Sequence, residues 1–143
     1  MLRKLIIGLL VLGFSISAAA KDEREQVQLP EMMREHMLSN MRDHLLALEI
    51  ITRNLAAGEY DTAAETAESR LGMTSMTSHG AAHMAPFMPE PMRTLGTAMH
   101  RAASRFAIKA KDAAVEGGLA EAFGALSEVM QQCVACHSGY RVH

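Results

Sequence analysis

Apolar side chains recur at intervals of three and four residues along most of this 143-residue chain. Such spacing predicts amphipathic helices, because it gathers the apolar residues on one face of each helix. Pro30, Gly58 and the pair Gly117 and Gly118 are well placed to begin or end them. No stretch alternates with a period of two, so no strand is predicted. We therefore expect four helices, at 30–57, 60–71, 90–116 and 119–138.

The connections between these helices are mostly short, which predicts an all-α fold in the form of an antiparallel four-helix bundle. The chain has no Trp, and its many Ala, Leu, Met and Glu residues also favour helices. The side chains expected to point inward are Met33, Met37, Met41, His44, Leu48, Ile51 and Leu55 in the first helix, Met92, Leu95, Met99, Ala103, Phe106, Ala110 and Ala113 in the third, and Leu119, Phe123, Leu126, Met130, Cys133 and His137 in the fourth.

The segment 72–91 interrupts the helical pattern with two glycines and three prolines, and only a short helical turn at 81–85 is expected there. It is rich in thioether and imidazole side chains: Met73, Met76, His79, His83, Met84 and Met88. If that stretch is helical, His79 and His83 could bind one ion, and the thioethers would favour Cu(I). We favour the alternative, in which these methionines fill irregular gaps in the core.

The first twenty residues have the pattern of a secretory signal peptide. Arg3 and Lys4 precede an apolar run at 5–14, and small residues at 18–20 form a cleavage site. The apolar run is shorter than the roughly 20 residues that a membrane-spanning helix needs. We therefore expect a periplasmic protein whose mature domain is 21–143. The net charge of −2 and the lack of a basic block give no reason to expect nucleic-acid binding.

The sequence ends in "CVACHSGYRVH", which contains both cysteines of the chain. On a helix, Cys133, Cys136 and His137 occupy positions i, i+3 and i+4 of one face. A structural zinc site needs four ligands, and a redox dithiol is expected beside a βαβ unit, which the pattern does not predict. A disulfide closing so small a loop would restrain the unfolded chain little. C-x-x-C-H is typical of covalent haem c attachment.

The tail also resembles a known family. "CVACHSGYR" matches the pattern C-x-x-C-H-x-x-aromatic-basic near the C-terminus of the cytochrome c′ family, the class II c-type cytochromes, and "AAGEYDTAAETA" resembles the first inter-helix turn of that family. The resemblance implies a four-helix bundle with one haem near one end. It further implies that His137 is the proximal iron ligand and that Tyr140 and Arg141 pack beside the haem. The alternative for these last two residues is a frayed, solvated tail.

Members of this family differ at the sixth position of the iron. Some leave it open and bind small gases, whereas low-spin relatives supply a methionine from the first helix and carry electrons. Met41, in "NMRDH", resembles that methionine. Met37 and His44 share its helical face and remain open alternatives.

The predicted function is periplasmic electron transport through one covalent haem c, with redox proteins of the periplasm as partners. Nothing in the sequence suggests an acid–base pair or a catalytic triad, so we do not predict an enzyme. The alternatives are a five-coordinate protein that binds NO or CO, and a copper-handling haem protein that uses the segment 72–91. Because members of the family often pair, a homodimer is also considered.

Overall fold

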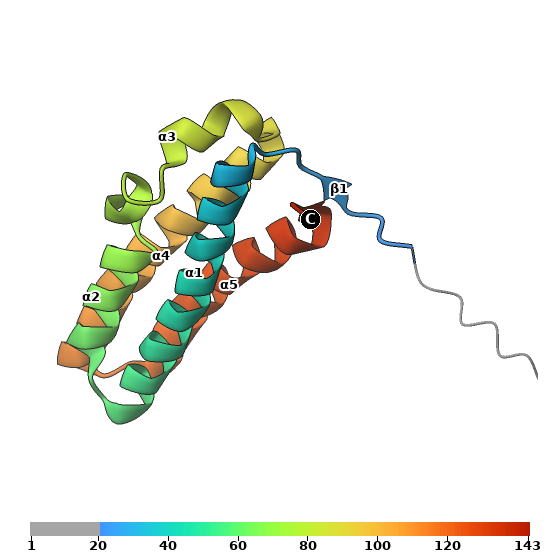
Figure 1. Ribbon diagram of the computed structural model, residues 1–143. Coiled ribbons are helices and arrows are strands. Elements are labelled where there is room, and N and C mark those ends of the chain that lie inside the picture. Colours follow the sequence, from blue (N-terminus) through green and yellow to red (C-terminus); the bar gives the residue numbers. More distant parts are fainter. Residues whose placement is uncertain (1–20) are drawn as a thin grey trace, which may run out of the picture.

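The computed structural model describes residues 21–143, and the predicted signal peptide lies outside them. The described part is all-α, as predicted, apart from two strands of two residues each. Figure 1 shows the helices, which are α1 (Glu31–Ala57), α2 (Tyr60–Arg70), α3 (Ala81–Met84), α4 (Glu90–Glu116) and α5 (Leu119–Gly139), with the short 3-10 helices η1 (Met73–Met76) and η2 (Ala85–Phe87).

The helix ends lie where the punctuating residues predicted them. Gly58 follows α1 with φ of 78°, and its amide donates to the carbonyls of Asn54 and Leu55. Gly117 follows α4 with φ of 74°, a conformation that side chains other than that of glycine rarely adopt. Pro30 directly precedes α1, and Pro89 directly precedes α4. Amide hydrogens at the start of a helix have no partner within the helix, and a proline has no such hydrogen to leave unbonded.

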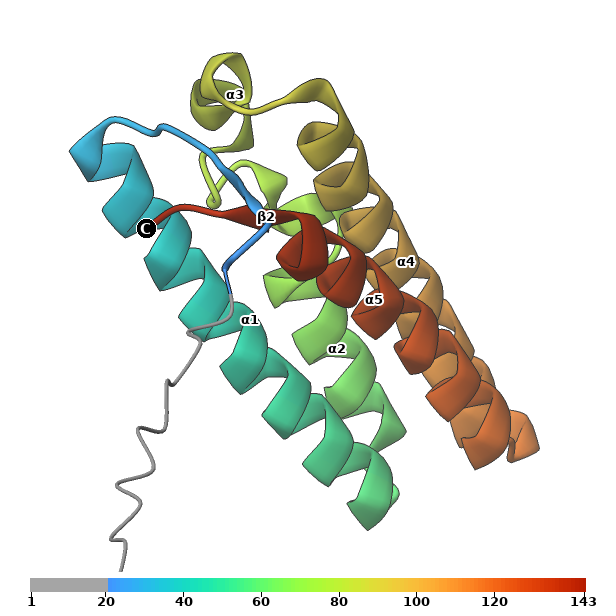
Figure 2. The same ribbon diagram turned by 90° about the vertical axis from the view of Figure 1, so that its right-hand side faces the viewer.

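Each long helix packs mainly on the next: α1 on α2, α2 on α4, and α4 on α5 (Figures 1 and 2). The larger part of the core contains Ile51, Leu55, Leu71, Phe106 and Leu126, each at most 2% exposed, among many alanines that allow close packing of the helices. A smaller part, around Val27, Met37, Met84 and Met92, lies against Cys136 near the end of α5.

The predicted inward faces of α1 and α4 are largely confirmed, whereas that of α5 is partly wrong. Leu119, Phe123 and Met130 were expected inside but are about 40% exposed. His137, expected on the same face, is exposed as well. The buried residues of α5 are instead Ala122, Leu126 and Val129. The reason is that α5 packs chiefly on α4 and makes little contact with α1.

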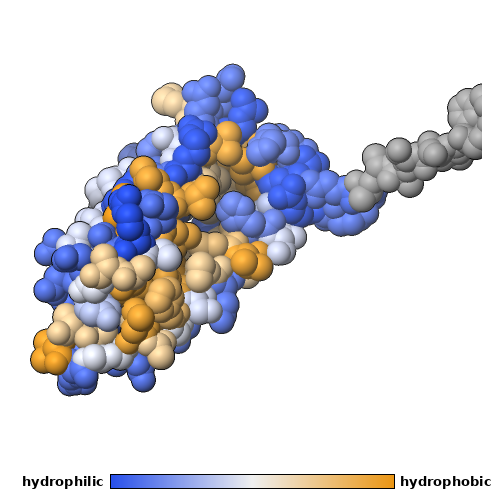
Figure 3. Space-filling model, turned by 90° about the horizontal axis from the view of Figure 1, so that it is seen from below, coloured by the Kyte–Doolittle hydropathy of each residue, from blue (hydrophilic) through white to orange (hydrophobic). Residues whose placement is uncertain are grey.

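Exposed hydrophobic residues are consequently common on this molecule, and many gather on the face shown in Figure 3. The large ones that are at least half exposed include Leu45 and Leu46 of α1 and Val134 of α5. No helix within 21–143 is long and apolar enough to cross a membrane.

Strand β1 (Glu25–Gln26) pairs in parallel with β2 (Tyr140–Arg141), next to the end of α5 (Figure 2). The amide of Val27 extends this pairing by donating to the carbonyl of Arg141 at 2.8 Å. Strands of two residues are too short for any periodicity, so the sequence pattern did not predict them. The pairing holds the start of the domain against its C-terminal motif.

Candidate functional site

An apolar cavity of about 410 Å³ lies among α1, the segment 72–91, α4 and α5. Seven methionines line it: Met37, Met41, Met76, Met84, Met88, Met92 and Met99. Cys136 reaches it from α5, and His44, His79 and His100 line it as well. The volume is within the usual range of ligand and cofactor sites, about 300–1,000 Å³.

The C-terminal motif lies on a regular part of α5, which continues to Gly139. Cys133 and Cys136 are both free and half-buried, and the Cys133 thiol donates to the carbonyl of Val129 at 3.5 Å. Burial raises the pKa of both thiols. Redox-active cysteines have lowered pKa values, so this environment argues against a redox dithiol. His137 is exposed on the same helix.

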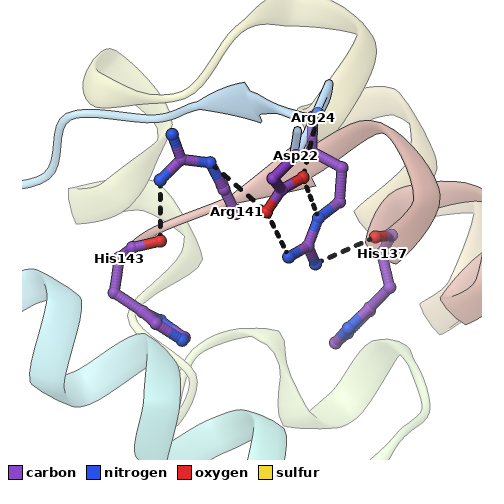
Figure 4. Close-up of polar contacts among 5 residues, drawn as sticks. All are labelled: Asp22, Arg24, His137, Arg141 and His143. Carbon is purple, nitrogen blue, oxygen red and sulfur yellow. Dashed lines mark hydrogen bonds and ion pairs between the residues drawn. The ribbon is translucent and has the colours of Figure 1, made fainter. Parts of the chain in front are cut away.

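Tyr140 and Arg141 lie in β2 with half-buried side chains, so the tail is not frayed. Figure 4 shows that Arg141 belongs to a cluster that sequence analysis missed. Asp22 lies between two guanidinium groups, 2.7 Å from Arg24 and 3.6 Å from Arg141. Arg24 donates to the carbonyl of His137 at 3.4 Å. Arg141 also donates to the main-chain oxygen of His143 at 2.9 Å, and the cluster lies directly beside the motif.

The structure places the three candidates for a distal iron ligand on the wall of the cavity. Met37 and His44 are buried, Met41 is half-buried, and all three come from α1. Cys136 lines the same cavity from α5. The first and last helices of the domain therefore contribute sulfur or nitrogen side chains to one apolar space.

Three histidines from separate elements meet at this cavity. The ring centroids of His44, on α1, and His79, after η1, are 4.8 Å apart, and that of His100, on α4, is 5.3 Å from His79. His100 Nδ1 lies 2.7 Å from the Leu71 carbonyl, which requires a proton on that nitrogen. Ser75 Oγ lies 3.4 Å from both His79 and His100. Sequence analysis assigned no role to His100, although it follows the buried Met99.

The pair of His79 and His83 considered above does not form. His79 is buried, whereas His83 is exposed in the short helix α3. Gly80 separates them with φ of 63°, so that the two residues do not lie on one continuous helix. The expected helical turn near 81–85 is present as α3 and η2.

Burial and neighbouring groups lower the pKa values of His44 and His79. Burial, followed by the neighbouring His79 and His100, lowers the pKa of His44 to about 4. Burial and His100 also lower the pKa of His79. Asp43 acts in the opposite direction, but it is paired with Arg70 of α2, which lowers the pKa of that carboxyl. His44 and His79 are therefore neutral near pH 7.

This burial predicts a loss of stability in acid. Between pH 6.5 and 4 the unfolded chain protonates His44 and the folded chain does not, so the free energy of unfolding falls as the pH falls. A difference of about 2.5 pKa units corresponds to about 3 kcal/mol. Urea unfolding in the presence of a chelator, followed by circular dichroism, should show a smaller loss in His44→Gln. The exposed His83→Gln should behave like the wild type, and equal pH dependence in all three proteins would contradict this assignment.

Within 21–143, no three side chains drawn from His, Cys, Asp and Glu are arranged to hold a metal ion. Comparisons with protein-family models, with curated proteins and with solved structures found no match. The resemblance to the cytochrome c′ family therefore remains a prediction from the sequence.

Proposed function

We propose that this protein is a periplasmic c-type cytochrome of the cytochrome c′ type, which carries electrons through one haem c. Cys133 and Cys136 would hold the haem covalently, His137 would be the proximal ligand and Met41 the distal one. A haem held in this way supplies reversible one-electron chemistry between ferric and ferrous iron. The remaining work of the chain is to bind, orient and shield that group.

The observation that carries the proposal is that the C-x-x-C-H helix borders the methionine-lined cavity. Cys136, from this motif, and Met41, from α1, line the same apolar space of about 410 Å³. The thiols are free and their raised pKa values disfavour the redox alternative. Cys136 and Met41 therefore suit a covalently attached apolar group with a sulfur ligand, whereas Cys133 and the exposed His137 lie on the same helix outside the lining of the cavity.

The packing of the helices supports the bundle part of the proposal. Consecutive long helices pack on one another, while α1 and α5 make little direct contact. Short turns join α1 to α2 and α4 to α5, and the segment with η1, α3 and η2 joins α2 to α4. We propose that α1, α2, α4 and α5 form an antiparallel four-helix bundle in which the haem fills the space between the first and last helices. The guanidinium groups of Arg24 and Arg141, beside the motif, would favour negatively charged groups at the haem edge.

The optical spectrum of the purified protein tests the electron-transfer function. A low-spin spectrum in both oxidation states, with slow binding of CO, is expected for iron with two axial side-chain ligands. A high-spin ferrous spectrum with fast CO binding would favour the alternative of a five-coordinate protein that binds NO or CO. Purified protein without any haem spectrum, after expression with a haem-attachment system, would overturn both.

A further inference from the structure

The contact between His44 and His79 is unusual for a hydrogen bond. His44 Nε2 lies 3.5 Å from His79 Nδ1, beyond the distance of about 2.7–3.2 Å at which an N–H donor normally bonds its acceptor. Two imidazole nitrogens that bind one ion at about 2.0–2.1 Å are about 3.3–3.6 Å apart, for angles near 109–120° at the ion. The observed separation therefore suits a shared ion better than a shared proton.

The other contacts leave these two nitrogens available. His100 Nδ1 is engaged by the Leu71 carbonyl at 2.7 Å, so that nitrogen is not free to bind an ion. Among residues 21–143, the other close partner of His79 Nδ1 is Ser75 Oγ, at 3.4 Å. Buried polar atoms usually have a closer partner than this. His44 and His79 are each 8% exposed, and both line the cavity.

The surroundings of the pair indicate the class of ion. No third His, Cys, Asp or Glu within 21–143 completes a metal site. Met76, three residues before His79, and Met99, next to His100, line the same cavity. Thioether sulfur with imidazole nitrogen is a soft ligand set, which suits Cu(I) and not Mg²⁺ or Ca²⁺.

We propose that His44 and His79 bind one Cu(I) ion, with the thioether of Met76 or Met99 as a third ligand. This site differs from one within the segment 72–91, because it joins that segment to α1 and does not use His83. It requires neither Met41 nor His137, so it does not rest on the proposed electron-transfer function.

The test is equilibrium dialysis of the full-length purified protein against Cu(I) under anaerobic, reducing conditions, with copper and iron measured separately. We expect one Cu(I) per chain with Kd below about 1 μM. His44→Ala and His79→Ala should each weaken binding by at least about tenfold, since even residues that only support a metal ligand contribute about 10–100-fold. The exposed residues provide the controls, and His83→Ala and Met73→Ala should bind copper like the wild type.

Two further measurements keep the result interpretable. Circular dichroism of each variant identifies any that has lost its helices, and His44→Gln and His79→Gln then replace the alanine variants. X-ray absorption at the copper edge should show nitrogen and sulfur neighbours.

The proposal is overturned by binding weaker than about 1 μM, by binding that depends on His83 or Met73 instead, or by a copper spectrum without sulfur. A change of the iron spectrum in His44→Ala would also overturn it, because His44 would then be an iron ligand.

Discussion

Replacing both Cys133 and Cys136 with serine is expected to remove all covalently bound haem. A serine hydroxyl cannot form the thioether bonds that link a c-type haem to its protein, and each of these thiols is free. Extraction with acidified acetone measures the effect: the haem should stay with the wild-type protein. The matched control is Val134→Ser, since Val134 is 65% exposed between the two cysteines and its replacement should leave attachment intact. Wild-type haem that passes into the organic layer would refute covalent attachment.

The same double variant is expected to be mostly unfolded. Without the haem, the apolar lining of the cavity of about 410 Å³ would be left in contact with water, which costs about 25 cal/mol per Å² of apolar surface. Total stabilities are about 5–15 kcal/mol, so even a part of this cost is large. Far-ultraviolet circular dichroism should show a clear loss of helix. Full helicity without haem would mean that the helices close over the cavity by themselves.

Replacing Met41 with alanine is expected to change the iron from low-spin to high-spin. Met41 is half-buried on α1 and lines the cavity together with Cys136. Loss of a thioether ligand should open the sixth position, so CO should bind fast. It should also lower the reduction potential by about 0.1 V or more, within the span of about 0.8 V that axial ligands cover. Optical spectra, CO mixing and redox titration measure these effects.

Other positions on α1 distinguish ligation from packing. Met32→Ala is the matched control, because Met32 is 81% exposed on the same helix and should leave the spectrum unchanged. Met37→Ala and His44→Ala test the two alternative ligands, which line the same cavity. If either changes the spin state while Met41→Ala does not, the distal ligand has been assigned to the wrong residue. A wild-type protein that is already high-spin would mean that Met41 only packs in the core.

The sequence alone was sufficient for features that depend on neighbouring residues. Pro30, Gly58 and Gly117 marked the helix ends. Proline restricts the backbone conformation and glycine widens it, and both effects depend only on the residue itself. The inward faces of α1 and α4 followed from their periodicity, because both helices have one side packed against α2. The candidate motif was likewise readable, since the spacing of Cys133, Cys136 and His137 along a helix is a local property.

Only the tertiary structure decided what depends on how the helices pack. Phe123 and Met130 fit the apolar period of α5 but are exposed, because that helix packs on α4 through Ala122, Leu126 and Val129. Periodicity shows that a helix has an apolar face, but the neighbouring helix determines which residues that face buries. Arg24 meets His137 across 113 positions of the chain, and no local pattern could have paired them. The histidine cluster is of the same kind: its members come from α1, the loop after η1 and α4, and they become neighbours only when these elements pack together.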